Sequence, residues 1–311
     1  MAATTSTGNW QKSLWPGIDG WFNDAYNEWD TEYTSLFTTR QSGRQFEQTV
    51  GMSLFGRAPI KAEGNPLEYD STQQTYVNQY DNQVRALGAI ITLEAYRYNQ
   101  YNLDALSRQP KALARSIRHT KEEAGADVLN NGFSGSFTMG SGSDGVALFS
   151  NSHPSGPFGD ARDNLLTAAD LSETVLEDAC IQIAGAVDPR GLKVQIMPYC
   201  LVIPRQLEFI AGRILHSTLQ NDTANNALNV LKDQNSLPAG HKINHYLTDS
   251  DAWFVTTSIN ESGEGLVHYN NWDMEFGLDN DFDTFNMKVK CFEAYSFGWD
   301  DFQGVFGNQG S

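Results

Sequence analysis

One glycine-rich motif in the chain has the spacing of a phosphate-binding loop. The pattern G-x-G-x-x-G occurs at residues 140–145. In nucleotide-binding proteins this pattern needs a strand before it and a helix N-terminus after it, where the pyrophosphate binds. Here a predicted helix ends just upstream, and the Ser- and Pro-rich segment 149–157 cannot continue as a helix. The sequence therefore predicts a flexible surface loop and no nucleotide site.

Two groups of side chains have spacings that suggest a metal site. Asp279, Asp281 and Asp283 alternate like calcium ligands, but Thr284 stands where the EF-hand turn needs glycine. The segment is not an EF-hand, and a divalent ion held between subunits stays open as an alternative. A second group, His241 and His245, has i, i+4 spacing, but it lies in a strand-like segment where that spacing does not converge on one ion.

No nucleophile stands out in the chain. A G-x-S-x-G elbow is absent, and Cys180, Cys200 and Cys291 lie in apolar surroundings typical of inert, reduced thiols. Carboxylates are plentiful, but nothing in the linear sequence singles out a pair placed for glycoside hydrolysis. We therefore predict no catalytic residue, no cofactor-binding residue, no metal ligand and no cofactor. An acidic hydrolase remains only a weak alternative.

The N-terminal third predicts an aromatic arm followed by strands. Residues 10–38 are dense in aromatic and acidic side chains, which need a surface to bury against, either on this chain's own core or on another molecule. Residues 44–69 alternate on both sides of Gly64 and predict a long two-stranded hairpin. A second strand-rich stretch, 75–98, is too long to be stable as an isolated hairpin and needs support from a neighbouring element or molecule.

The rest of the chain mixes helices and strands. A helix is predicted at 107–131, with Pro110 in its first turn, and a second helix begins at a capping-box-like Asp170-x-x-Glu173. Strands are predicted with Asp, Asn, Ser and Gly turns between them at 200–203, 242–246, 253–257, 266–269 and 286–297. Because no regular βαβ rhythm appears, the predicted class is α+β.

Charge and composition exclude several classes of protein. The chain has 311 residues with 38 acidic and 21 basic side chains, a formal net charge of −17. Such a charge opposes nonspecific adsorption to nucleic acid or to anionic lipid. No apolar run approaches the roughly 20 residues that span a bilayer, and no export signal is expected at the N-terminus. The odd number of cysteines, 3, favours synthesis in a reducing cytosol.

Short sequence blocks follow one another in a fixed order from the long predicted helix to the C-terminus. They lie at 115–122, 128–133, 144–150, 153–154, 169–174, 201–204, 223–226, 246–254, 279–284 and 295–300. In this order they resemble the major head subunit family of Mu-type and related tailed phages. Before about residue 100 the resemblance is one of layout only, and the tail 300–306 departs from the ending of the family.

The resemblance implies the major-capsid fold of tailed phages, the Hong Kong ninety-seven type. Its expected parts are an N-terminal arm, an extended E-loop hairpin with flanking strands, a P-domain with a long spine helix, a central A-domain, and a return to the P-domain with a C-terminal tail. They are assigned here, in that order, to 1–40, 41–98, 99–165, 166–269 and 270–311.

The function implied by the resemblance is structural. Subunits are expected to assemble as pentamers and hexamers into an icosahedral head around double-stranded DNA, which they contact nonspecifically. Expected partners are a separate scaffolding protein and a portal, with a decoration protein left open and no membrane. The expected location is the virion, after synthesis in the cytoplasm of the bacterial host. The same fold also builds shells of bacterial nanocompartments, which is the structural alternative.

Two sets of basic residues are candidates for contacts between subunits. Arg108, Lys111, Arg115 and Arg118 recur along one face of the predicted spine helix. This stripe could be a solvated face, could contact packaged DNA, or could receive an acidic segment such as 24–32 of a neighbour, which is the interpretation we favour. The second candidate is Lys61 near the hairpin tip, for which no covalent cross-link is expected. We also expect hairpin 42–73 to pack on a neighbouring subunit.

Overall fold

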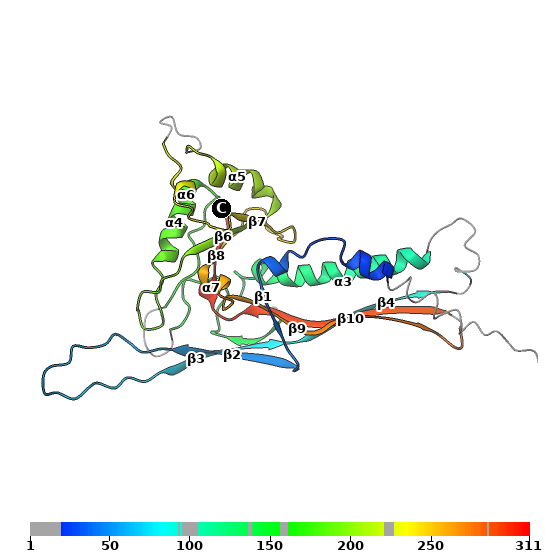
Figure 1. Cartoon of the computed structure of the whole chain (residues 1–311), viewed down its shortest axis with the longest axis horizontal. Coiled ribbons are helices and arrows are strands. Elements are labelled where there is room, and N and C mark those ends of the chain that lie inside the picture. The colour runs from blue at the N-terminus through cyan, green and yellow to red at the C-terminus, as the bar shows by residue number, and fades with distance from the viewer. Residues whose placement is uncertain are drawn as a thin grey trace, which may run out of the picture. The chain divides into compact units, whose positions relative to one another are not determined.

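The computed structural model describes residues 20–92, 94, 105–135, 139–155, 161–220, 227–284 and 286–311. Its elements, labelled in Figure 1, are η1 (Tyr33–Ser35), β1 (Thr38–Gln41), β2 (Phe46–Ser53), β3 (Gln73–Asp81), β4 (Gln83–Ile91), α3 (Ala105–Asn130), β5 (Gly140–Ser143), α4 (Glu173–Ala184), β6 (Pro198–Ile203), η3 (Arg205–Leu207), α5 (Glu208–His216), α6 (Val230–Asp233), β7 (His241–Ile243), β8 (Trp253–Thr257), α7 (Ser258–Glu261), β9 (Leu266–Asn280), β10 (Met287–Trp299), η4 (Phe302–Gly304) and β11 (Val305–Asn308). The predicted α+β class is confirmed.

The chain divides into two compact units. The first takes the described residues within 1–32, 83–124 and 270–295. The second contains 33–82, 125–269 and 296–311. Each unit has its own apolar core.

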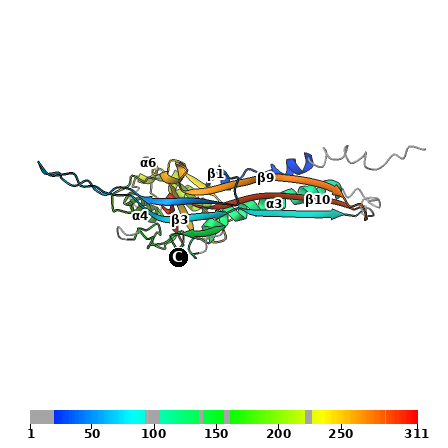
Figure 2. The same ribbon diagram turned by 90° about the horizontal axis from the view of Figure 1, so that it is seen from below.

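The first unit is a helix packed on one face of a sheet. Strand β4 pairs antiparallel with β10, from Gln83 opposite Tyr295 to Ile91 opposite Met287. In the first part of β10 burial alternates, so that Val289 is buried between the exposed Lys288 and Lys290, and from residue 293 onward the strand is buried throughout. Helix α3 covers the buried face, and Figure 1 and Figure 2 both show it running along these strands.

The helix α3 follows the prediction closely. Leu113, Ala114 and Ile117 recur at the spacing of one helix face, and all three are buried against β10. Phe22, in a helical segment at residues 20–26, is buried in the same cluster, with its ring 4.6 Å from that of Phe276. The aromatic arm was expected to bury its side chains either on the chain's own core or on another molecule, and Phe22 is buried on the chain's own core.

The second unit has its main core around the sheet β11–β8–β6–β7. Residues 200–203 of β6 and 253–257 of β8 are buried throughout, as expected for strands covered on both faces. Helices α4 and α5 supply Leu176, Ile183 and Ile214 to this core. This sheet is the most enclosed part of the unit.

Three predictions about local structure were wrong. Residues 140–143 form strand β5 on the edge of β3, with Tyr80 opposite Gly140, because pairing to an existing strand outweighs the weak strand propensity of Gly and Ser. The cap of α4 is Ser172, whose side chain accepts from the Val175 N–H, and not Asp170. The return strand of the hairpin is β3 at 73–81, so stretch 75–98 is shared between β3 and β4, with residues 93 and 95–98 outside the described part.

Candidate interaction surfaces

The hairpin β2–β3 turns its apolar side away from its own unit. Phe46, Val50 and Met52 alternate along β2, and each side chain is about half exposed, at 45%, 49% and 59%. We call these three residues the apolar row. Gln48 shares their exposed side, whereas Glu47 and Thr49 face inward and are more covered although they are polar. A strand that stabilised only its own unit would have the opposite pattern, because burial favours the apolar face.

The apolar exposure continues beyond the strands into the hairpin tip, residues 54–72. Figure 1 shows this loop projecting past the ends of β2 and β3. Its large apolar side chains are uncovered in the described structure, with Ile60 fully exposed and Tyr69 at 93%. Exposed apolar side chains that follow one another along a projecting arm indicate a contact surface for another molecule.

The base of the hairpin is fastened to the unit through Asp300. Its carboxylate accepts from Arg40 Nη1 at 2.6 Å, from Thr49 Oγ1 at 2.9 Å and from the Tyr80 hydroxyl at 2.5 Å. The donors come from β1, β2 and β3, so one side chain next to the end of β10 joins three strands. Burial and the negative charge of Asp300 hold the pKa of Tyr80 well above its usual range, which keeps the hydroxyl protonated as a donor.

Backbone carbonyls beside Asp300 extend this attachment. The carbonyl of Trp299 accepts from Asn78 Nδ2 at 2.9 Å and from the Tyr80 hydroxyl at 2.6 Å, and that of Asp300 accepts from Tyr76 at 3.3 Å. The inward polar face of β3 therefore has hydrogen-bonding partners in the body of the unit. Sequence reasoning missed Asp300, and the only signal was an acidic residue directly after an aromatic strand.

A second uncovered surface lies in the first unit, on the sheet face opposite α3. Val84 and Ile90 of β4 are 55% and 59% exposed, with Ala86 and Gly88 exposed between them. We call these four residues the open sheet face. The neighbouring β10 places Lys290 opposite Gly88. Among the described residues no element covers this apolar stripe, and cationic side chains line one side of it.

The predicted basic stripe lies on α3, and two of its members contact the same chain. Arg115 forms a forked pair with Glu28, with 2.7 Å between Nη2 and Oε2 and 2.9 Å between Nε and Oε2. Arg118 donates to the carbonyl of Trp29 at 3.1 Å, and its guanidinium lies 5.1 Å from the centre of the Tyr26 ring. The acidic segment that we expected from a neighbour thus reaches Arg115 within one chain. Arg108 is exposed.

Beneath the stripe, Lys121 and Glu293 form a buried ion pair that sequence reasoning did not single out. Their charged atoms are 3.0 Å apart, and the side chains are 6% and 0% exposed. Burial raises the pKa of Glu293, and the charge of Lys121 opposes the rise. The pair connects α3 to β10, and removing one partner would leave a buried charge uncompensated.

A buried histidine joins three loops of the second unit. His153 is fully buried. Its Nδ1 lies 2.5 Å from Asp144 Oδ2, and its Nε2 lies 3.0 Å from Asn164 Oδ1, both within hydrogen-bonding distance. Its ring stacks on Phe302 at 3.7 Å between centroids. An Asp–His pair can serve a nucleophile, but here both ring nitrogens already contact acceptors within the fold. The arrangement is structural, and Asp144 is the acidic residue of the glycine-rich motif.

The remaining chemical candidates do not come together in the described structure. Burial raises the pKa of Cys180, Cys200 and Cys291 to about 11, which suppresses the reactive thiolate at neutral pH. Asp281 forms an ion pair with Lys288 at 2.7 Å, which holds its pKa below the usual range. Within the described ranges no three metal-ligating side chains gather, and no helix is long and apolar enough to cross a membrane.

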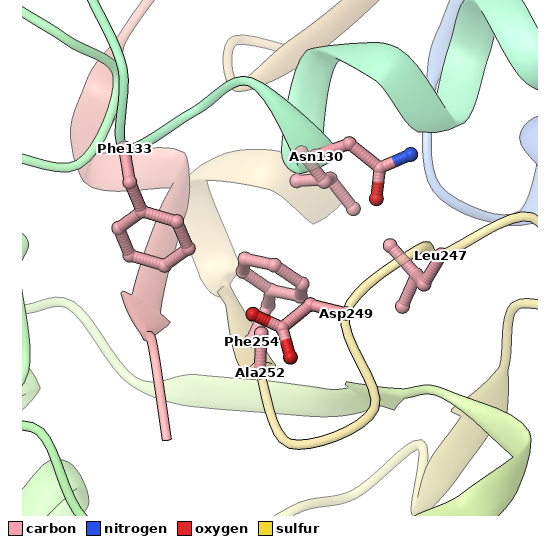
Figure 3. A pocket seen from close by; sticks show the side chains of 7 residues that line it. Asn130, Phe133, Leu247, Asp249, Ala252 and Phe254 are labelled. Atoms are coloured by element: carbon pink, nitrogen blue, oxygen red, sulfur yellow. The ribbon is translucent and has the colours of Figure 1, made fainter. Parts of the chain in front are cut away.

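One shallow pocket lies where α3 ends in the second unit. Figure 3 shows Phe133 and Phe254 lining it beside Leu247, with Asn130 and Asp249 at its edge. Both amide atoms of Asn130 are used within the fold, on the Tyr246 carbonyl at 3.1 Å and the Thr248 N–H at 3.0 Å. The pocket therefore has mainly apolar walls, and the amide of Asn130 holds the loop that follows β7.

Comparison with known proteins gives one family and a set of similar folds. A family model described as phage capsid protein matches residues 78–308. The capsid of cyanophage P-SCSP1u has a TM-score of 0.54 at 11% identity, covering 91% of this chain and 88% of that one. The mature capsid of bacteriophage PhiM1 has a TM-score of 0.54 at 10% identity, covering 90% and 87%.

A virus-like particle from Pyrococcus furiosus is also similar, with a TM-score of 0.52 at 9% identity, covering 94% of this chain and 97% of that one. At such identities these likenesses establish the fold alone. The comparison with curated proteins found no match.

Proposed function

This chain belongs to the phage capsid protein family, and from that premise we propose that it is the major head subunit of a Mu-type or related tailed phage. It is a structural shell protein and not an enzyme, with the fold of tailed-phage major capsid proteins. The family model speaks against the acidic hydrolase and does not favour the nanocompartment shell. The subfamily rests on the ordered sequence blocks.

The parts of the fold are assigned by their order along the chain. Residues 1–40 form the arm and 41–98 the E-loop hairpin with its flanking strands. The P-domain takes 99–165, with α3 as its spine helix, and 166–269 form the A-domain around α4, α5 and the β6–β8 pair. The return to the P-domain and the tail occupy 270–311. The long hairpin β2–β3, the length of α3 and the enclosed sheet of β6 and β8 support this assignment.

The proposed role in assembly follows from the hairpin's exposed apolar side and covered polar side. The single observation that carries the proposal is the apolar row, which points away from the unit while Asp300 fastens the polar side. We assign the open sheet face of a neighbouring subunit as the surface that the apolar row and tip contact. Fully burying one large apolar side chain contributes about 1.5–3 kcal/mol, and repetition around a closed shell multiplies weak contacts.

The other partners are proposed on the same basis. Subunits form pentamers and hexamers of a capsid, assembled with a separate scaffolding protein and a portal in the bacterial cytoplasm. Packaged double-stranded DNA is contacted nonspecifically. The exposed Arg108, with Lys111 beside it on α3, is available for the contact between subunits that the basic stripe predicts, with DNA as the second choice.

Introducing a charge at the hairpin tip tests the assembly role. Ile60→Asp places a carboxylate on the most exposed apolar side chain, so it should abolish shells while leaving the subunit folded. Negative-stain microscopy counts closed shells, and circular dichroism confirms the fold. The matched control is Asn65→Asp in the same loop, which adds the same charge without removing an apolar side chain. If Ile60→Asp still assembles at the yield of the control, the hairpin does not make the contact.

A further inference from the structure

We propose that Arg190 is a latch, which holds the root of the hairpin tip against its own subunit and so fixes the direction in which the apolar row is presented to a neighbour. The root consists of Gly56, Asp70 and Ser71, where the chain leaves β2 and returns to β3. This inference rests on the proposed shell-building function for its consequence. Its structural half concerns the free subunit alone.

The latch is built from charge-assisted hydrogen bonds across the root. Arg190 Nη1 donates to Asp70 Oδ2 at 2.7 Å, and Nη2 donates to the carbonyl of Ser71 at 2.5 Å. The same carboxylate oxygen of Asp70 accepts from the N–H of Gly56 at 2.8 Å. One arginine therefore gathers both sides of the loop at one point. Its side chain is only 11% exposed, against 43% for Asp70.

The turn that carries Arg190 is closed independently of the hairpin. Asp188 Oδ1 accepts from the N–H groups of Arg190 and Leu192, both at 2.8 Å. The backbone N–H of Asp188 also donates to the carbonyl of Leu192 at 2.8 Å, and Gly191 has a positive φ of 76°. The guanidinium is thus presented by a rigid support, as a latch requires.

The backbone at Gly56 approaches the latch closely. A Cβ atom built on Gly56 would lie 3.2 Å from Arg190 Nη1, tighter than most side-chain contacts, and 3.5 Å from Asp70 Oδ2, an ordinary contact distance. A side chain at position 56 would therefore press on the guanidinium, whose end would have to shift slightly.

A bend point lies between the latch and the fastened base of the hairpin. The strand register shifts between Val50 and Met52, where Thr75 and Tyr76 of β3 stand opposite Gly51 alone, as in a β-bulge. A Cβ on Gly51 would come within 2.6 Å of Thr75 Oγ1, so only glycine fits there. Asp300 holds the hairpin on one side of the bulge, and Arg190 holds it on the other. With both attachments the arm has one direction, and without the latch it can pivot at the bulge.

Whether the latch speeds or slows assembly follows from the conformational entropy that the hairpin loses when it docks. A hairpin already held in its docking direction loses little conformational freedom when a neighbour binds it, whereas a pivoting arm loses more. The backbone N–H of Gly56 and then the Arg190 side chain hold the pKa of Asp70 below its usual range, so the pair stays charged in mild acid. Breaking the latch is expected to slow assembly and not to accelerate it.

The test compares Arg190→Gln with Arg205→Gln, which removes an equal charge from an arginine that is exposed. In the free subunit, NMR order parameters of the amides of 54–56 and 70–72 should fall from about 0.85 toward about 0.6 in Arg190→Gln only. Light scattering should show shell formation slowed about two- to fivefold, the range that loss of a partly exposed ion pair produces. Asp70→Asn should act in the same direction, and the double variant should add little.

Several results would overturn the latch. Unchanged order parameters in Arg190→Gln would remove its structural basis, and faster assembly would make the contact inhibitory. Equal slowing in Arg205→Gln would reduce the effect to net charge. If the wild-type chain forms no shells, the proposed function fails, but the order parameters still decide whether Arg190 holds the hairpin.

Discussion

The hairpin β2–β3 and the sheet pair β6–β8 use strands in opposite ways. In β6 and β8 the apolar residues are enclosed, and Trp253 and Leu201 have no exposed surface. In β2 the apolar row faces outward while the polar residues Thr49 and Glu47 face the unit. The first arrangement stabilises one subunit. The second uses hydrogen bonds to hold the strand and leaves its apolar side for a partner, so stability and assembly are assigned to different regions.

The largest expected effect comes from truncating the enclosed sheet. Trp253→Ala removes a fully buried ring from the main core, so the free energy of unfolding should fall by about 3–5 kcal/mol. Val50→Ala, in the apolar row, should cost less than about 0.5 kcal/mol, because that side chain is half exposed. Urea denaturation of the two variants measures both values. Similar losses would mean that the apolar row stabilises its own subunit after all.

A smaller effect is expected at the polar attachment of the hairpin. Asp300→Asn removes the charge that pairs with Arg40, which should cost about 1–2 kcal/mol locally and speed amide exchange in 46–50 and 77–81. Amides of β8 should keep their wild-type exchange rates. The matched control is the exposed Asp233→Asn, with the same change of charge. Faster exchange throughout β8 would show that Asp300 supports the core and not the hairpin specifically.

The prediction with the smallest change in stability concerns the reactivity of cysteine thiols in the core and at the hairpin tip. At pH 8 the pKa of about 11 at Cys200 should reduce its thiolate, and its reaction with a thiol reagent, by about a hundredfold relative to an ordinary thiol. A cysteine placed in the tip by Ile60→Cys should react at the ordinary rate, because position 60 is fully exposed. Stopped-flow absorbance follows both reactions. Rapid reaction of the native thiols in the folded chain would contradict the enclosed core.

Much of the fold could be predicted because local patterns decide local elements. The spacing of Leu113 and Ile117 predicted α3, and the aromatic and β-branched residues of 253–257 predicted β8 with its bounds. Strand β5 could not be found in this way, since Gly and Ser have little strand propensity and only pairing with β3 creates it. The return strand of the hairpin was placed too early because alternation at Leu67 and Tyr69 continues past the end of the paired region.

The candidate surfaces could likewise be predicted from the sequence only in part. A basic stripe is visible in sequence because its members are neighbours on one helix, but its contact with Glu28 depends on how residues 20–32 fold back on α3. In the sequence, Asp300 was noted only as the last residue of the block 295–300 and the first of the departing tail 300–306, with no structural role. Its partners Thr49 and Tyr80 are remote in the chain, and no local pattern connects them.

The sequence by itself determined that the chain folds as an α+β protein, that it resembles phage head subunits, and that a long hairpin precedes a long helix. Alternation in β2 defined two faces, one apolar and one polar. Only the tertiary structure decided that the polar face turns inward, because that choice depends on Asp300 and Arg190 meeting the hairpin from distant parts of the chain. The two-residue period of a strand separates its two faces, and long-range hydrogen bonds determine which face turns toward the unit.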